Sequence, residues 1–570
     1  MSILHFHPQN ISLKFEPIHN LQIMFKKLTL VALVIGSTSF SAQKNQTSQP
    51  DRPKLVVGLV VDQMRWDYLY RYYEKYQNDG FKRMLKEGYS MNNVHINYVP
   101  TYTAVGHTTI YTGSVPAIHG IAGNDWFDKA TGKNVYCTGD DTVKPVGSTS
   151  EKVGNHSPRN LWSTTITDEL RLATNFQAKV VGVSLKDRAS ILPAGHNPTG
   201  AYWFDDTTGN FVTSSYYMTQ LPQWVNDFNN KKIGDDLVKN GWNTLLPIAQ
   251  YIESSPDNSP WEELLGSAKT PVFPYSNLAE DYKTKKGEIR STPFGNTLTL
   301  RLAEAAVKGE QLGADSVTDF LAINLASTDY AGHKFGPNSI EVQDVYLRLD
   351  RDLAEFFKYL DKTVGKDQYT VFLSADHGGA HSQGFMAEHK MPTGFYGETS
   401  KKDFNLILKD KFSIDQLVTK VTNNQIYLDS KLMHDSKLEE EQVKQFLIDQ
   451  LNNDKEILFA VDMKKVASSS IPEPIKSRII NGYNWQRSGD IQLIYHDSWL
   501  PSYSKLGTTH GAWNSYDSHI PLLFMGRGIK AGESNSEYHM TDIAPTLAAL
   551  LRIQFPSGNV GKPIVEVLGK

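Results

Sequence analysis

Cysteine is almost absent from this chain, because Cys137 is the single cysteine among 570 residues. One thiol forms no intrachain disulfide and no thiolate cluster for a metal ion. Its context, VYCTGDD, also lacks the C-x-P-x-R pattern of sulfatases that depend on formylglycine. We therefore expect stability to come from a packed core and from any bound metal ions.

An excess of charge of one sign and long apolar runs are lacking as well. The chain has 58 Lys+Arg and 62 Asp+Glu, a formal net charge of -4, so no overall field favours nucleic acid or an anionic membrane. No apolar run approaches the roughly 18 residues that cross a bilayer. We expect no nucleic-acid partner and no stable membrane insertion. A G-x-S-x-G nucleophile elbow is also missing.

The N-terminal region has the three parts of a secretory signal peptide. Lys26 and Lys27 precede the apolar run LTLVALVIG, and small polar residues follow it up to Ala42. We expect residues 1–42 to be a leader that directs export to the periplasm or the medium, with Met24 as a candidate true start. The alternative is a cytosolic protein with a buried N-terminal helix.

Short valine-rich apolar runs recur along the chain, as is typical of parallel strands buried on both faces. They end at Asp62, Lys186, Asp329 and His377, and a further run is PLLFM at 521–525. Amphipathic helices lie between several of them, such as the segment 339–362. This alternation predicts an α/β fold with a doubly wound, mostly parallel sheet and helices on both faces.

Two stretches interrupt this rhythm and predict insertions on a catalytic core. The first is rich in Trp, Tyr, Asn and Pro, and the second is rich in Lys and Glu. In the second, Ser436 and Glu439 predict a capping box ahead of an amphipathic helix. The predicted division is a core at 43–188, 297–400 and 501–570, with insertions at 189–296 and 401–500.

Polar residues able to bind a cation stand where the apolar runs stop. Asp62, Asp329, Asp376 and His377 end such runs, while His333 follows Asp329 by four positions and His510 lies just ahead of the run at 521–525. In an open α/β sheet, ligands bind beyond the carboxyl ends of the strands. Three carboxylates and three imidazoles suit Zn²⁺ and exceed the needs of one tetrahedral site, so two ions are expected. Taken singly, each residue is more often a helix cap or a core polar group.

The segment YVPTYTAVGHTTIYTG, at 98–113, carries five threonines around His107. A threonine at a helix N-terminus places its hydroxyl beside unpaired backbone N–H groups, where a phosphate also binds. A nearby metal ion lowers the pKa of such a hydroxyl and turns it into a nucleophile. The pattern favours a nucleophile loop, and the alternative is a threonine-rich turn that enters a helix.

Three further residues predict an anion site. Lys186 and Arg188, in SLKDRAS, face the same side if that segment is extended, so both cations reach one ligand. Asn124, in GIAGNDW, offers an amide hydrogen bond to a phosphoryl oxygen. The alternatives are a solvated strand end and a turn-forming asparagine.

With these motifs, the sequence resembles the alkaline phosphatase superfamily near its type I phosphodiesterase/nucleotide pyrophosphatase branch, most closely the phosphate-irrepressible alkaline phosphatases. The stretches that carry the resemblance are VVGLVVDQMRWDYL, YVPTYTAVGHTTIYTGSVPAIHGIAGNDW, VGVSLKDRAS, NLASTDYAGH, LSADHGGAHS and GTTHGAWNSYDSHIPLLFMG. They extend from Val56 to Gly526 and cover the predicted core.

The resemblance implies two Zn²⁺ ions and assigns a role to each residue. One zinc would be held by Asp62, Asp376 and His377, with the oxygen of the nucleophile Thr103 beside it. The other would be held by Asp329, His333 and His510. Asn124, Lys186 and Arg188 would contact the phosphoryl oxygens. The additional magnesium site of the better-known bacterial alkaline phosphatases has no matching motif here.

The resemblance also implies a substrate class, small-molecule phosphate monoesters, hydrolysed through a phosphothreonine. The Lys-x-Arg pair favours monoesters, since the family's diesterases lack it. Alternatives are a phosphodiesterase or nucleotide pyrophosphatase with the same metals, and a secreted binding protein that captures phosphate compounds without turnover. We expect the protein to be a monomer.

Overall fold

The computed structural model describes residues 52–150, 153–397, 401–501 and 505–568. The predicted signal peptide lies outside these residues. Within the described part of the chain, none of the helices is long and apolar enough to cross a membrane.

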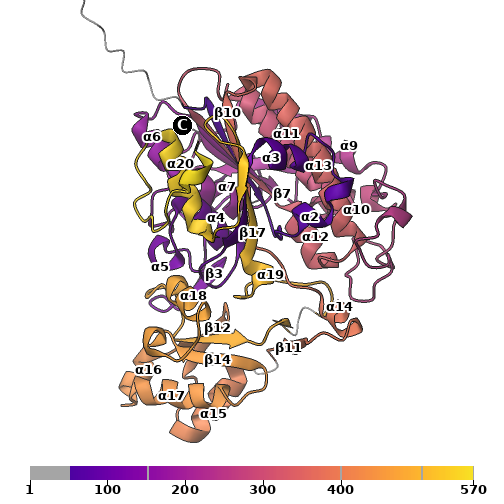
Figure 1. The fold of residues 1–570 in the computed structure, drawn as a ribbon. Coiled ribbons are helices and arrows are strands. Elements are labelled where there is room, and N and C mark those ends of the chain that lie inside the picture. Colours follow the sequence, from indigo (N-terminus) through magenta and orange to yellow (C-terminus); the bar gives the residue numbers. More distant parts are fainter. Residues whose placement is uncertain (1–51, 151–152, 398–400, 502–504, 569–570) are drawn as a thin grey trace, which may run out of the picture. The chain divides into compact units, whose positions relative to one another are not determined.

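A mixed sheet of eleven strands forms the centre of the molecule (Figure 1). Its five middle strands, β10, β1, β9, β6 and β7, are parallel to one another. In spatial order the path of the sheet is β18 (Gly532–Ser534), β2 (Tyr89–His95), β17 (His519–Gly526), β10 (Tyr369–Ser374), β1 (Leu55–Val61), β9 (Asp319–Leu325), β6 (Val180–Ser184), β7 (Gly200–Asp205), β8 (Asn210–Ser214) and β5 (Pro145–Val146), with β19 (Tyr538–His539) paired to β2.

The predicted mostly parallel sheet is confirmed, because the continuous apolar runs are the middle strands. Every residue of β1, β9, β6 and β10 is buried. β17 differs, since it runs antiparallel to both of its neighbours, β10 and β2. A fully buried antiparallel strand has the same apolar composition as a parallel one, so composition alone does not give its direction.

Helices cover both faces of the sheet, as predicted. In Figure 1, one group lies on one side of the sheet and the other group on the opposite side. The first group is α4 (Thr103–Thr112), α6 (Ile166–Ala173), α7 (Asp187–Ala194) and α20 (Ile543–Leu551), and the second is α3 (Phe81–Glu87), α11 (Pro293–Gly309), α12 (Ser327–Phe335) and α13 (Ile340–Leu360). The α13 N-cap, Ser339, accepts a hydrogen bond from the Val342 N–H at 3.1 Å, which fixes where this amphipathic helix starts.

The segment 189–296 shares the main hydrophobic core. β7 and β8 extend the central sheet, and the buried Trp203, Phe211 and Trp242 belong to the same cluster as the residues of β1. Its helices are α8 (Gln223–Asn230), α9 (Ile233–Val238) and α10 (Leu278–Thr284).

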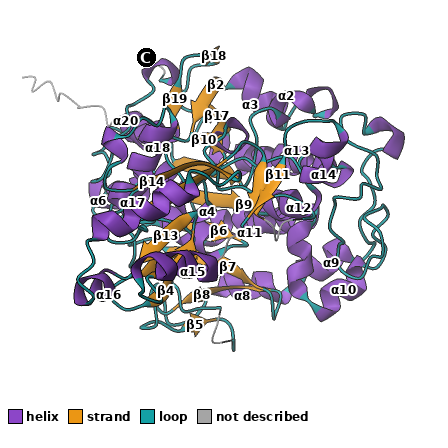
Figure 2. Cartoon of the chain, turned by 90° about the horizontal axis from the view of Figure 1, so that it is seen from below, coloured by secondary structure: helices purple, strands orange, loops and turns teal. Residues whose placement is uncertain are grey.

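The segment 401–500 has a core of its own, built around Leu408, Ile426 and Leu447. It forms a four-stranded antiparallel sheet with helices beside it (Figure 2). The elements are α15 (Lys401–Phe412), β12 (Val418–Thr422), β13 (Gln425–Leu428), α16 (Ser430–Asp435), α17 (Glu440–Leu451), β14 (Ile457–Asp462), α18 (Ile475–Gly482) and β15 (Ile491–Tyr495). The exact boundaries of both predicted insertions remain predictions.

The predicted capping box in this segment is wrong. Glu439 is itself the N-cap of α17 and makes no side-chain cap, while Ser436 ends the preceding helix, α16. The pattern S-x-x-E spans a helix end here, where the chain leaves α16 through Lys437 in the left-handed region.

One pair of acidic residues is buried in the core away from the strand ends. Glu341 lies in the first turn of α13 and is fully buried, and Glu262 is 4% exposed. Burial together with the charges of Glu341 and Asp257 raises the pKa of Glu262 to about 10, and burial raises the pKa of Glu341 to about 8. The folded protein therefore keeps a carboxyl proton bound at neutral pH. In the unfolded chain the same glutamate releases this proton above the ordinary glutamate pKa of about 4.3.

This pair predicts a pH-dependent stability. Because the folded protein binds the proton more tightly, the free energy of unfolding falls as the pH rises, by up to about 1.4 kcal/mol per pH unit for one carboxyl. We expect Glu262→Gln to reduce this fall between about pH 6 and about pH 9, measured by urea unfolding. The exposed Glu280→Gln is the control. Equal pH slopes for the wild type and Glu262→Gln would contradict the prediction.

Candidate active site

The predicted polar residues converge beyond the carboxyl ends of the parallel strands. Asp62 directly follows β1, Asp376 and His377 follow β10, and Lys186 follows β6. Asp329 was expected at a strand end, but β9 stops at Leu325 and Asp329 lies in the first turn of α12. The helix begins immediately after the strand, so the carboxylate still reaches the same edge of the sheet.

The first group of metal-capable side chains is Asp62, Asp376 and His377, whose ligand atoms all lie within 4.8 Å of one another. His377 Nε2 is 3.7 Å from Asp62 Oδ1 and 3.3 Å from Asp376 Oδ2. Both of these carboxylate oxygens are buried and have no hydrogen-bond partner among the described residues. Asp376 Oδ2 also lies 3.3 Å from His107 Nδ1, so Asp62 Oδ1 is the buried oxygen that most clearly indicates a place for a cation.

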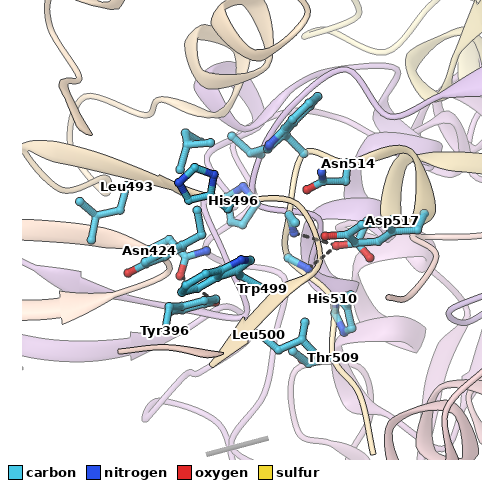
Figure 3. Close-up of a pocket in the computed structure, with 18 of the residues that line it drawn as sticks. Tyr396, Asn424, Leu493, His496, Trp499, Leu500, Thr509, His510, Asn514 and Asp517 are labelled. Carbon is cyan, nitrogen blue, oxygen red and sulfur yellow. Dashed lines mark hydrogen bonds between the residues drawn. The ribbon is translucent and has the colours of Figure 1, made fainter. Parts of the chain in front are cut away.

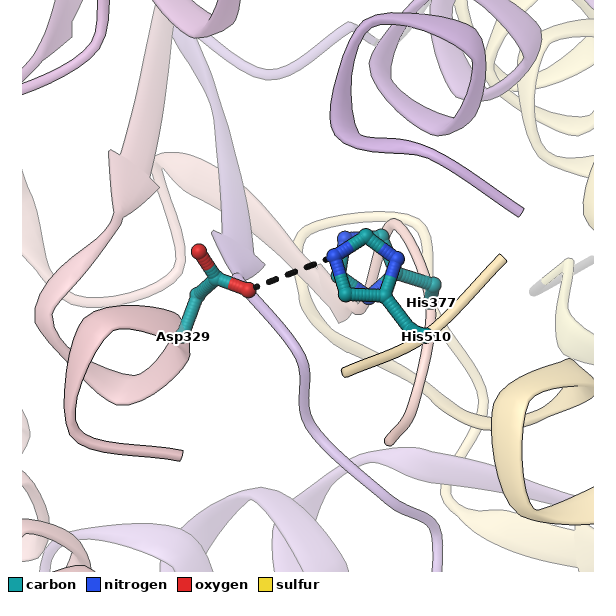
Figure 4. Close-up of side chains that lie close together, drawn as sticks. All are labelled: Asp329, His377 and His510. Carbon is teal, nitrogen blue, oxygen red and sulfur yellow. Dashed lines mark ion pairs between the residues drawn. The ribbon is translucent and has the colours of Figure 1, made fainter. Parts of the chain in front are cut away.

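The second group centres on Asp329. Its Oδ1 is 3.2 Å from His333 Nε2 and 3.7 Å from His510 Nε2. His377 joins this group too, since its ring stacks on His510 with centroids 3.5 Å apart (Figure 4). The two groups are therefore adjacent.

Backbone carbonyls orient all three imidazoles. His333 Nδ1 lies 2.8 Å from Thr508 O, His377 Nδ1 2.8 Å from Gly378 O, and His510 Nδ1 2.7 Å from Thr101 O. A proton on each Nδ1 leaves the Nε2 lone pair directed at a carboxylate, an arrangement typical of metal-binding histidines. Ligand atoms around a tetrahedral Zn²⁺ stand about 3.3 Å apart, so the observed separations fit zinc.

Thr103 is the first residue of α4, and its hydroxyl points at the first group. Thr103 Oγ1 is 3.4 Å from His377 Nε2 and 3.5 Å from Lys186 Nζ. The helix approaches this closely because of Gly106, where a Cβ would stand 2.2 Å from the Asp376 carbonyl oxygen. The Thr101 hydroxyl, by contrast, is hydrogen-bonded to the backbone, because it donates to Ala512 O at 3.0 Å.

Lys186 connects the two groups. Its ammonium donates to Asp62 Oδ2 at 2.9 Å and to Asp329 Oδ2 at 2.6 Å. Burial disfavours the charged form, but the charges of Asp329 and Asp62 outweigh burial and raise the pKa of Lys186 above its usual value. The side chain is therefore a permanent cation beside Thr103.

The predicted extended geometry of Lys186 and Arg188 is wrong, because α7 begins at Asp187. Arg188 lies in the first turn of this helix and donates to the Tyr136 hydroxyl at 3.1 Å, while its buried Nε has no partner among the described residues. Asn124 Oδ1 accepts from the Ala104 N–H at 3.0 Å, which leaves its Nδ2 amide to donate to a ligand. All three predicted anion ligands thus border the N-terminal end of α4 or α7.

Sequence reasoning missed two amide side chains that hold the carboxylates. Asn324 Nδ2 donates to Asp62 Oδ2 at 3.1 Å, and Gln63 Nε2 donates to Asp329 Oδ1 at 2.8 Å. Two signals in the sequence could have found them. Asn324 is a polar residue within the apolar run DFLAINL, and Gln63 stands next to the predicted ligand Asp62. Asp517 was missed as well: its Oδ2 accepts the Gly511 and Ala512 N–H groups at 2.8 and 2.7 Å, which holds the loop that carries His510.

A small cavity of about 30 Å³ lies behind this loop (Figure 3). Its walls come from the loop at 509–517 and from Asn424, Tyr396 and Trp499 on the other side. A volume of this size holds one or two water molecules and no organic substrate. The cavity is therefore part of the contact between the His510 loop and the segments next to it.

A doubly wound sheet that gathers carboxylates and imidazoles beside a buried threonine hydroxyl defines a metal-dependent hydrolase. Residues 56–517 match the family described as type I phosphodiesterase / nucleotide pyrophosphatase, and the chain belongs to this family.

Two relatives with differing names align with nearly the whole of this chain. The alkaline phosphatase PafA of Elizabethkingia meningoseptica is 67% identical over 95% of this chain and 99% of its own length. A protein of Myroides odoratus named a calcium-transporting ATPase is 53% identical over 95% of this chain and 99% of its own length. The crystal structure of wild-type alkaline phosphatase PafA superposes with a TM-score of 0.90 at 69% identity, and covers 91% of this chain and 99% of that chain. The resemblance predicted from the motifs is confirmed.

The bridge made by Lys186 yields a prediction about metal removal. In metal-stripped protein, Lys186→Met would leave Asp62 and Asp329 without their buried cation, at a cost of about 3 kcal/mol or more. With zinc in excess we expect a clearly smaller loss, since bound cations neutralise the same carboxylates. Urea unfolding with zinc and with a chelator measures both values.

The matched control for this prediction is Arg188→Met, whose guanidinium contacts Tyr136 and not these carboxylates. Its free energy of unfolding should change by similar amounts in the two conditions. The prediction fails if Lys186→Met also shows the same loss with and without zinc.

Proposed function

We propose that this protein is an alkaline phosphatase, a metal-dependent phosphomonoesterase that releases inorganic phosphate from diverse small-molecule phosphate monoesters. The observation that carries the proposal is the place of the Thr103 hydroxyl, at the start of α4 and between His377 Nε2 at 3.4 Å and Lys186 Nζ at 3.5 Å. The names of both relatives also refer to enzymes that cleave bonds between phosphorus and oxygen.

We propose two Zn²⁺ as the metal cofactor. Asp62, Asp376 and His377 would hold one ion together with Thr103 Oγ1, and Asp329, His333 and His510 would hold the other. The unpartnered Oδ1 atom of Asp62 and the imidazoles oriented by backbone carbonyls support these sets. Bound metals supply positive charge that lowers the pKa of a hydroxyl and stabilises entering and leaving oxygens.

In the proposed reaction Thr103 Oγ1 attacks phosphorus, which forms a phosphothreonine as the ester P–O bond breaks and the alcohol departs with a proton. Water then attacks the phosphothreonine, which releases inorganic phosphate and restores the hydroxyl. The start of α4 supports this step, because N–H groups of a first helical turn stabilise a phosphoryl oxygen, and Asn124 already engages the Ala104 N–H of this turn. Gly106 allows α4 to approach Asp376 closely, which keeps the Thr103 hydroxyl next to the first ligand group.

Lys186, Arg188 and Asn124 would bind the remaining phosphoryl oxygens. Lys186 is next to the nucleophile, Arg188 Nε has no hydrogen-bond partner among the described residues, and the Asn124 amide accepts from the Ala104 N–H through Oδ1, which directs its Nδ2 elsewhere. A monoester carries one more negative charge than a diester, so two cations near the phosphoryl group favour it.

Replacing the nucleophile tests the reaction directly. We expect Thr103→Ala to lower kcat for a phosphate monoester by about 1,000-fold or more, because no other side chain takes over the covalent step. Zinc content, measured by atomic emission, should stay near that of the wild type. Retention of most activity would rule out Thr103 as the nucleophile.

The second candidate function is a phosphodiesterase or nucleotide pyrophosphatase, which the family description favours. A comparison of kcat/KM for a phosphate monoester and a matched diester separates the two. We expect a strong monoester preference, and we expect Arg188→Ala to lower monoester kcat/KM by about 10- to 100-fold, the value of one charged hydrogen bond, with a smaller effect on the diester.

Arg188 is the cleaner variant for this test, because Lys186 also bridges two proposed metal ligands. The exposed Arg301→Ala is the matched control. A diester preference in the wild type would overturn the substrate assignment. Phosphate release that stops near one equivalent per protein would instead favour a binding protein.

We also propose that the protein is exported, to the periplasm or the medium, and that it acts as a monomer. Export is supported by the signal-like segment at 26–42. Phosphate acquisition from monoesters outside the cytoplasm is the role that fits both proposals.

A further inference from the structure

Gln63 occupies an unusual backbone position between the two ligand groups. It follows Asp62, is 6% exposed, and has a φ of 60°, in the left-handed region that few residues other than glycine adopt. Such a conformation persists inside a protein when the contacts around it require it.

The contacts of Gln63 reach both groups at once. Its backbone N–H donates to Asp376 Oδ1 at 3.1 Å, and its side-chain Nε2 donates to Asp329 Oδ1 at 2.8 Å. Because Lys186 binds Asp329 Oδ2, the two donors together fix the plane of the Asp329 carboxylate. That plane directs Oδ1 toward the Nε2 atoms of His333 and His510.

Two glycines provide the space for this side chain. A Cβ at Gly332 would stand 1.9 Å from Gln63 Oε1, and a Cβ at Gly379 would stand 3.0 Å from Gln63 Cδ. Gly332 precedes His333 in α12, so the turn that carries one proposed ligand is shaped around the Gln63 amide.

We propose that Gln63 is a positioning residue, which holds Asp329 and Asp376 in the orientations in which each binds its metal ion. The inference rests on the proposed two-metal site. Residues that hydrogen-bond metal ligands typically change metal affinity by 10- to 100-fold when they are replaced. The side chain of Gln63 serves the Asp329 group, and its backbone serves the Asp376 group.

Asn324 is the natural counterpart, because its amide donates to Asp62 in the other group. Gln63→Met and Asn324→Leu each remove one amide at similar volume, and each affects one group. The pair therefore allows the two metal sites to be weakened separately.

The test measures zinc affinity by chelator competition on full-length protein in a Thr103→Ala background, so that the readout does not depend on turnover. We expect Gln63→Met to lower the affinity for one of the two zinc ions by about 10- to 100-fold. The affinity for the other ion should stay within about threefold of its original value. Combining it with His333→Ala should leave the affinity for the other ion unchanged, since both changes act on the same ion. Asn324→Leu combined with His333→Ala should weaken the remaining ion.

Three outcomes bear on the inference. The inference is overturned if Gln63→Met lowers the affinity for both ions equally, or if it lowers the affinity for neither ion. Additive losses for Gln63→Met and His333→Ala on different ions would also overturn it. If the Thr103→Ala protein binds two zinc ions and the expected pattern appears, the inference stands even where the proposed reaction fails.

To separate positioning from loss of folding, Gln63→Gly keeps the left-handed backbone and the N–H to Asp376. We expect it to weaken the same single ion as Gln63→Met, with the near-UV circular dichroism of the wild type. Gln63→Gly with wild-type affinity for both ions would overturn the role of the side chain.

Discussion

Mutual repulsion among buried carboxylates is the constraint on which the rest of this structure depends. Asp62, Asp329 and Asp376 are all buried and close together. Burial and the charge of Asp376 raise the pKa of Asp62 well above its usual value, whereas Lys186 and His333 overcome burial and hold the pKa of Asp329 well below it. One ammonium, together with His333 beside Asp329, does not balance the charges of three carboxylates. The two proposed metal ions would supply the missing positive charge.

Much of this could be predicted from the sequence because it depends on residues close to the strand ends. Continuous apolar runs give the parallel strands, and the polar residue that stops each run falls at the edge where ligands bind. Two of the errors share a cause. Asp329 and Arg188 lie in helices that begin directly after a strand, and sequence patterns do not show how soon a helix follows. The Asp329 carboxylate still reaches the site, since the first turn of such a helix lies over the strand end.

Other features depend on contacts between distant segments and could not be predicted. Gln63 and Asn324 matter because of which carboxylate each amide reaches, which no local pattern encodes. The segment 401–500 is another case. It has its own core, yet Asn423, in the turn between β12 and β13, donates to Asp125 O at 2.7 Å, directly beside Asn124. A segment that composition marks as peripheral thus supports the backbone of a proposed phosphate ligand.

β17 joins two parts of the central sheet that are far apart in the sequence. It lies between β2 and β10, which are separated by more than 270 positions, and it pairs with both of them. His510 precedes β17 by a few residues and is held by the loop that leads into it. The strand that joins the two parts of the sheet and the loop that carries His510 are therefore continuous in the chain. A change that displaces β17 would displace the His510 imidazole as well, so the sheet and the candidate site share this segment.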